Sequence, residues 1–241
     1  MDLYLKIATQ LQNFFKYDLI YLPIELQGKI IRIEVQLPEL EPLNWLGRQQ
    51  SAVKTYWSDR QSKFTMAGVG ELDLITGDRS IDYPAVFTQL RKNLSPLFPQ
   101  VRYYGGVSFS QDQLIDPHWQ LFGNYRFVVP KFEVWTNGLN TFFACNFTCD
   151  FRADRLDLIL QELAQLDFDL VTTSRDLPAQ IDRIDTPTQT EWAQNIDTAL
   201  AKFTTLNLDK IVLARRSILT FTHNLHPQSL LQSLQPNNAH S

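Results

Sequence analysis

The sequence lacks long hydrophobic runs and any surplus of basic residues. No uninterrupted apolar run in its 241 residues exceeds four, whereas a membrane-spanning helix needs about 20 apolar residues and a signal-peptide core about 7–15. We therefore expect neither a membrane span nor an export signal. With 22 Lys and Arg against 26 Asp and Glu, the formal net charge is −4. This balance predicts no nucleic-acid partner, because proteins that bind nucleic acids neutralise phosphates with a basic face.

Cysteine is scarce, since Cys145 and Cys149 are the only two. Both fall in a segment that predicts a strand, in which residues four positions apart have Cα atoms roughly 13 Å apart. A disulfide allows at most about 7 Å between the Cα atoms. We therefore expect two free thiols, and this cysteine usage is typical of a reducing, cytoplasmic compartment.

Familiar catalytic motifs are also missing. The sequence has no Gly-x-Gly-x-x-Gly, no phosphate-loop lysine motif, no Gly-x-Ser-x-Gly elbow and no paired-cysteine zinc pattern. His223 and His226 have a His-x-x-His spacing, but no nearby Cys, Asp or Glu completes a set of metal ligands. A solvated turn is therefore the favoured interpretation of these histidines. Residue spacing alone identifies no catalytic centre and no metal site.

The sequence does have the composition of a packed globular protein, with 44% hydrophobic and 20% charged residues. In the first part of the chain, apolar periodicity predicts both helices and strands. The expected helices span 3–16 and 82–97, and the expected strands span 29–37, 53–57, 64–69 and 101–110. The strand at 29–37 alternates in a way that predicts burial of one face. The Gly105-Gly106 pair indicates a bulge or a close backbone approach.

In the second part of the chain, Asn137-Gly138 is a strong hairpin signal between two aromatic and β-branched segments. Thr188 and Glu191 can form a capping box, and Asn207 is the expected cap at the end of the same helix. The expected elements are strands over 124–135, 139–151 and 209–221, helices over 155–166, 188–206 and 227–234, and a linker over 172–187. This order predicts an α+β fold, antiparallel and β-rich with flanking helices, in two domains, 1–187 and 188–241.

Several segments, taken in order, carry a resemblance to one enzyme family. They are Met66-Ala67-Gly68-Val69-Gly70; Arg102-Tyr103-Tyr104-Gly105-Gly106-Val107-Ser108-Phe109; Trp119, Phe122 and Phe127-Val128-Val129-Pro130-Lys131-Phe132-Glu133; and Glu191-Trp192, Ile196, Ala199-Leu200 and Leu208-Asp209-Lys210-Ile211-Val212-Leu213-Ala214-Arg215. The first three resemble the amino-terminal region of isochorismate synthases. The last resembles the opening of their chorismate-binding domain. These enzymes are related to anthranilate synthase component I, salicylate synthase and aminodeoxychorismate synthase.

The resemblance implies that Lys210 is the general base that activates water for attack at C2 of chorismate, while the C4 hydroxyl departs. Such a lysine must be neutral, so its pKa must be lowered from about 10.4, and an apolar strand around it could supply the desolvation. Anthranilate synthases carry glutamine at the matching position and use ammonia, so Lys210 favours an enzyme that uses water. From the pattern alone, Lys210 is a solvated lysine at the entry to a strand.

The resemblance also implies magnesium as cofactor and chorismate as substrate. Family members are longer, and their general acid, metal ligands and substrate-carboxylate contacts are expected beyond Ser241. We therefore expect an amino-terminal portion of the enzyme, with a truncated catalytic domain that is inactive alone. The alternatives are a non-catalytic β-rich domain, or the equivalent part of a salicylate or aminodeoxychorismate synthase. The oligomeric state and the choice between a quinone and a siderophore pathway stay open.

Overall fold

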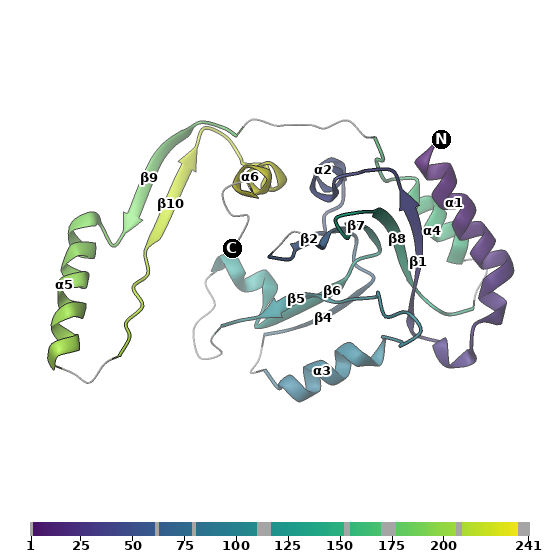
Figure 1. Ribbon diagram of the computed structural model, residues 1–241, viewed down its shortest axis with the longest axis horizontal. Helices are drawn as coiled ribbons and strands as arrows, with labels where there is room; N and C mark the ends of the chain where they lie inside the picture. The colour runs from purple at the N-terminus through teal and green to yellow at the C-terminus, as the bar shows by residue number, and fades with distance from the viewer. Residues whose placement is uncertain are drawn as a thin grey trace. The chain divides into compact units, whose positions relative to one another are not determined.

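The computed structural model describes residues 2–60, 63–78, 81–109, 117–151, 155–169, 177–205 and 209–235, and Figure 1 shows their secondary structure. The chain forms two compact units. The first comprises Met1–Thr173 and Leu234–Ser241, and the second comprises Ser174–Ser233. The boundary expected between residues 187 and 188 marks where a catalytic domain would begin. This boundary stays a prediction. No helix in the described ranges has both the length and the apolar character needed to cross a membrane.

The first unit contains a five-stranded antiparallel sheet with the strand order β1-β8-β7-β3-β2. Its strands are β1 (Ile30–Leu37), β2 (Lys54–Ser58), β3 (Thr65–Val69), β7 (Phe132–Thr136) and β8 (Thr141–Thr148). The hairpin predicted at Asn137-Gly138 joins β7 to β8. Gly138 has φ +83°, and the Asn137 side-chain oxygen accepts hydrogen bonds from the backbone N–H groups of Leu139 and Asn140. This part of the prediction is confirmed.

A second antiparallel sheet of the first unit has three strands in the order β4-β6-β5. They are β4 (Asp73–Gly77), β5 (Tyr104–Val107) and β6 (Tyr125–Val129). Strand β4 was not predicted, because its five residues have too few apolar positions to show a period. The close approach expected at Gly105 is confirmed, since a Cβ there would lie 1.9 Å from the carbonyl oxygen of Arg126.

The predicted strand over 124–135 is wrong as a single element, because it divides between the two sheets. Strand β6 ends at Val129 in the second sheet, and β7 begins at Phe132 in the first. Pro130 lies between them and has no backbone N–H to donate to a ladder, so a continuous strand is disfavoured there. The chain passes from one sheet to the other at Pro130 and Lys131.

Helices surround these sheets, as Figure 1 shows. They are α1 (Leu3–Asn13), α2 (Pro42–Arg48), α3 (Tyr83–Lys92) and α4 (Arg155–Leu163), with a π-helical turn (Phe14–Asp18) and 3-10 turns (Leu19–Tyr21, Ile24–Leu26, Pro117–Phe122). The helix predicted over 82–97 is confirmed in part, since α3 ends at Lys92. Asp82 caps α3, and Pro84 lies in its first turn, where a missing N–H costs nothing.

The core of the first unit lies on both faces of the five-stranded sheet. On one face, Phe15 stacks on Phe147 with ring centroids 5.1 Å apart, next to the buried apolar side of α1. On the other face, Ile30 clusters with Val101 and Val129. Strand β1 is therefore buried on both faces. The expectation of a half-buried strand is wrong, because residues that belong to or flank the second sheet cover the face assigned to solvent.

The second unit contains a two-stranded antiparallel ribbon of β9 (Gln180–Thr186) and β10 (Arg216–Phe221), with α5 (Gln189–Thr205) and most of α6 (Pro227–Leu234). The prediction of a linker over 172–187 is wrong for its last part, because β9 forms there. The strand expected over 209–221 is also too long. Pairing ends at Arg216 opposite Thr186, and Pro187 follows on the partner side with no N–H to continue the ladder.

Helix α5 begins with the predicted capping box. The Glu191 carboxylate accepts hydrogen bonds from the Thr188 backbone N–H and hydroxyl at 2.8 Å each, and the Thr188 hydroxyl accepts from the Glu191 N–H at 3.4 Å. These contacts lower the pKa of Glu191. Asn207, the expected cap at the other end, lies outside the described residues. The fold as a whole is mixed helix and antiparallel sheet, which confirms the α+β prediction.

Candidate functional site

Lys210, to which the resemblance assigns the role of base, lies in the second unit between α5 and β10. It is exposed. We expected an apolar strand around it, but the strand begins only at Arg216. The apolar environment on which the sequence argument relied is therefore not formed at this position. The catalytic role of Lys210 stays a prediction.

Among the residues that the structure describes, metal-binding and nucleophilic side chains do not define a further centre. In the part of the chain that the structure describes, no three His, Cys, Asp or Glu side chains lie together in a way that could hold a metal ion. His223 lies in a turn, with its Nδ1 atom 3.0 Å from the Thr222 hydroxyl. Cys145 and Cys149 are buried free thiols, as predicted. Burial raises the pKa of the Cys145 thiol, which disfavours the thiolate needed for nucleophilic attack.

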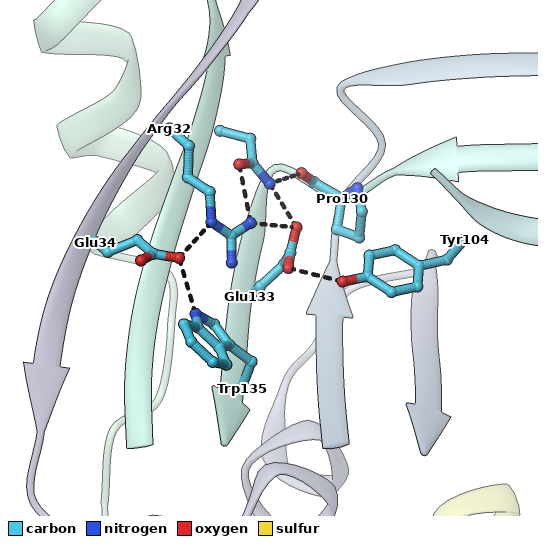
Figure 2. Close-up of polar contacts among 7 residues, drawn as sticks. Arg32, Glu34, Tyr104, Pro130, Glu133 and Trp135 are labelled. Carbon is cyan, nitrogen blue, oxygen red and sulfur yellow. Dashed lines mark hydrogen bonds and ion pairs between the residues drawn. The ribbon is translucent and has the colours of Figure 1, made fainter. Parts of the chain in front are cut away.

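The structure does assemble one buried polar cluster, which we call the Arg32 network: Arg32, Glu34, Tyr104, Glu133, Trp135 and Asn146. Its centre is the ion pair between Arg32 Nη1 and Glu133 Oε1 at 2.9 Å, whose side chains are 4% and 0% exposed. Arg32 also contacts Glu34 Oε1 through Nε at 2.6 Å, and the Trp135 indole N–H donates to the same oxygen at 3.0 Å (Figure 2). The guanidinium thus lies between two carboxylates.

Asn146 completes the Arg32 network from β8. Its side-chain amide donates to Glu133 Oε1 at 2.6 Å and to the Pro130 carbonyl at 2.9 Å, and its side-chain oxygen accepts from Arg32 at 3.2 Å. Tyr104 reaches the second carboxylate oxygen of Glu133 from β5, with its hydroxyl 3.5 Å away (Figure 2). The network therefore connects β1, β7 and β8 of the first sheet with β5 of the second.

Burial sets the electrostatics of the Arg32 network. It raises the pKa of the Glu133 carboxyl, although the Arg32 guanidinium and the hydrogen bond from Asn146 oppose that shift. Burial lowers the pKa of Arg32, but the two carboxylates beside it outweigh this effect and leave that pKa raised. Burial, together with the negative charge of Glu133, also raises the pKa of Tyr104. The pair needs its internal partners, because an unpaired buried charge is costly.

Sequence reasoning missed the Arg32 network. The alternation over 29–37 predicted burial of one strand face only, and Arg32 and Glu34 stand at the positions of the other face. Glu133 appeared only among the residues that carry the resemblance. One signal was available in the sequence. Arg32 and Glu34 stand at alternate positions of one strand, and so on the same face of it. Glu133, with a charge opposite to that of Arg32, stands on another strand. The network is closed, since each charged group has partners and Glu133 is fully buried. Its role is therefore structural, as a polar contact that links the two sheets.

Residues of the upstream segments that carry the resemblance lie in or near the Arg32 network. Gly68 on β3 lies against Pro130, where a Cβ would come within 2.6 Å of the proline ring. Gly105 on β5 lies against the backbone of Arg126 on β6. Tyr103 donates a hydrogen bond to Asp73 on β4. The contacts of Gly105 and Tyr103 join strands of the second sheet, and that of Gly68 lies where the chain passes between the sheets. All of these residues belong to the first unit, whereas Lys210 belongs to the second.

Comparisons with known proteins add what the geometry leaves open. The family model for chorismate binding enzymes matches residues 23–241. The chain is 25% identical over 264 residues to the chloroplastic isochorismate synthase of Catharanthus roseus, covering 87% of this chain and 44% of that protein. It is 23% identical over 224 residues to isochorismate synthase MenF of Bacillus subtilis (strain 168), covering 85% and 47%.

One solved structure of similar fold is that of MenF, the menaquinone-specific isochorismate synthase from Escherichia coli. The TM-score is 0.67 at 20% sequence identity, and the match covers 95% of this chain and 50% of that chain. This likeness supports the fold. The chain spans about half the length of the relatives it matches.

Proposed function

Because this chain belongs to the family of chorismate-binding enzymes, we propose that it forms part of an isochorismate synthase, which converts chorismate to isochorismate. The observation that carries the proposal is the family match over residues 23–241, supported by two relatives that bear this name. In the reaction, a C–O bond forms at C2 with the oxygen of water, and the C–O bond at C4 breaks. The attacking water loses a proton to a base, and the departing hydroxyl receives one from an acid.

Lys210 is the proposed base. A lysine accepts a proton only in its neutral form, and burial favours the neutral form of an amine. Lys210 is exposed here, so the proposed role requires cover that the second unit by itself does not provide. Substrate binding then places the water between the lysine nitrogen and C2 of chorismate.

The acid and the magnesium site are not assigned to residues of this chain. Magnesium is what the family resemblance implies, but no group of side chains in the described ranges fits a metal ion. This chain by itself is expected to show no turnover of chorismate, because a base without an acid and a metal loses contributions of about a hundredfold or more each.

A reconstituted enzyme tests the role of Lys210. This chain would be co-expressed with the half of Bacillus subtilis MenF that it does not match, and the product formed from chorismate and magnesium would be identified. We expect isochorismate from the wild type, and a loss of about 10²–10⁴-fold in kcat for Lys210→Ala, typical of removing a general base. Lys210→Arg is expected to be nearly as slow, because a guanidinium stays protonated.

The matched control is Lys202→Ala, which removes another exposed lysine of the second unit, in the last turn of α5. Its kcat should stay close to that of the wild type. Near-normal kcat in Lys210→Arg would contradict the assignment of the base. Formation of salicylate, or of aminodeoxychorismate when ammonia is supplied, in place of isochorismate would favour the other family reactions. A stable complex without turnover would contradict the proposed activity.

A further inference from the structure

The loop between β7 and β8 contains an Asn-Gly pair whose chemistry the proposed function does not use. Asn137 and Gly138 are both exposed. A backbone nitrogen can attack the side-chain amide carbon of an asparagine that precedes it, and the side chain of the following residue ordinarily obstructs this approach. Glycine has no Cβ, so at Gly138 this obstruction is absent. The loop is therefore a place where the chain can react with itself.

The hydrogen bonds of the loop fold the Asn137 side chain over the peptide that follows it. The side-chain oxygen Oδ1 accepts from the Leu139 N–H at 3.0 Å and from the Asn140 N–H at 2.8 Å. The ring that the bond from Leu139 closes includes both the Asn137 Cγ carbon and the Gly138 nitrogen. These atoms are the electrophile and the nucleophile of the attack, so the loop keeps the reacting groups near each other.

The same two N–H groups stabilise the charge that the attack creates. When the Gly138 nitrogen bonds to Cγ, negative charge develops on Asn137 Oδ1, the atom to which both groups donate. Their distances of 3.0 and 2.8 Å lie within the range of oxyanion holes, about 2.7–3.1 Å. Donors that are already in place lower the barrier, because nothing has to reorient as the charge forms.

Thr136 lies beside the proton that must leave. The Gly138 N–H donates a hydrogen bond to the Thr136 hydroxyl oxygen at 3.1 Å. The Gly138 nitrogen loses this proton when it attacks, and a hydroxyl can accept a proton while it passes its own to water or to a base in solution. Thr136 therefore gives the departing proton a path to the solvent around the loop.

We propose that Asn137 is a self-modification site, at which the folded loop promotes deamidation. The Gly138 nitrogen forms a bond to Cγ, the bond from Cγ to the side-chain nitrogen breaks, and that nitrogen leaves with a proton as ammonia. The product is a cyclic succinimide. Water then opens the ring, giving aspartate when the new Cγ–nitrogen bond breaks and isoaspartate when the original peptide bond breaks. No oxidant or reductant takes part.

Ageing of the full chain tests the proposal. The purified chain would be incubated in neutral buffer, either folded or unfolded in urea, and its digested peptides would be analysed by mass spectrometry. Heavy-oxygen water in the incubation marks the products that form there and not during digestion. We expect Asn137 to convert about tenfold or more faster in the folded chain, because unfolding removes both donors to Oδ1. A short peptide of the same sequence, measured in both solutions, corrects for any effect of urea itself.

Variants of Thr136 test the proton path. Thr136→Val keeps the β-branched shape but removes the hydroxyl, and it should slow the conversion in the folded chain about tenfold or more. Thr136→Ser keeps the hydroxyl and should react at nearly the wild-type rate. Asn140 is the matched control within the loop, because it is also exposed but precedes Thr141, whose branched side chain obstructs the attack. It should remain an asparagine.

Two results would overturn the proposal. Conversion of Asn137 that is no faster in the folded chain than in urea would mean that the loop does not promote the reaction. Conversion of Asn140 at the same rate would mean that exposure, and not the loop geometry, decides which asparagine reacts. Equal rates for the wild type, Thr136→Val and Thr136→Ser would overturn the role of Thr136. Each readout is independent of chorismate, so this inference and the proposed function stand or fall separately.

Discussion

The two units of the chain differ in how far they bury their apolar and charged side chains. In the first unit, Ile31, Phe143 and Val134 are fully buried, and even the charges of Arg32 and Glu133 lie inside. In the second unit, Ile184 and Leu200 are more than half exposed, and the Arg183–Asp185 ion pair lies at the surface. The comparison shows that the first unit forms a core of its own, while the described residues of the second unit bury few apolar side chains.

The largest expected effect comes from breaking the buried ion pair of the first unit. Arg32→Met leaves the Glu133 carboxylate in the interior without its cation, and removing one partner of a buried pair typically costs about 3–5 kcal/mol in the free energy of unfolding. Urea denaturation followed by tryptophan fluorescence would measure the loss.

The same change in the second unit is the matched control. Arg183→Met removes the cation of an exposed pair, with Arg183 Nε 3.0 Å from the Asp185 carboxylate, and should leave the free energy of unfolding nearly unchanged. Equal effects of the two substitutions would contradict the contrast between the units.

A smaller effect is expected where the two strands β5 and β6 meet most closely. Gly105→Ala places a methyl group against the Arg126 carbonyl oxygen, so the backbone must shift, at a cost of about 1–3 kcal/mol. Gly106→Ala is the control next to it, because a Cβ at Gly106 meets no atom within 4 Å. It should change stability by less than about 0.5 kcal/mol. Thermal unfolding of both variants checks the prediction, which fails if Gly106→Ala is the more damaging change.

The smallest effect concerns pH. Burial raises the folded-state pKa of Glu133 above its ordinary value of about 4.3. Between these two values, the folded protein holds a proton that the unfolded chain has released. This proton contributes its full amount to the free energy of unfolding below the ordinary pKa. The contribution is lost as pH rises through the folded-state pKa.

The measurement is the difference in the free energy of unfolding between the wild type and Glu133→Gln, which cannot titrate. We expect this difference to fall as pH rises above about 4.3, by at most about 1.4 kcal/mol per pH unit. Urea denaturation at a series of pH values would show it, and a difference that grows with pH would contradict the sign.

Much of the local structure was predictable because it depends on neighbours in sequence. The capping box at Thr188 and Glu191 and the loop at Asn137-Gly138 each involve residues within four positions of one another, and both formed as predicted. Alternation over 29–37 placed β1 almost to the residue. The free state of Cys145 and Cys149 followed from the geometry of an extended strand.

Other features could not be predicted, because they depend on which strands become partners. The burial of Arg32 needs β7 and β8 beside it and the second sheet above it. The start of β10 at Arg216 depends on where β9 and Pro187 lie. The exposure of Lys210 depends on what covers the second unit, and periodicity carries no information about that.

The sequence by itself determined the mixed α+β character, the free thiols, the capping box of α5 and the hairpin, and its ordered motifs indicated the chorismate-binding family. Only the tertiary structure decided that the chain changes sheets at Pro130, that Arg32 and Glu133 form a closed internal pair and that α5 exposes apolar side chains. The physical reason is that local hydrogen bonding and residue conformation are set within a few positions. Burial is set by contacts between segments far apart in the chain.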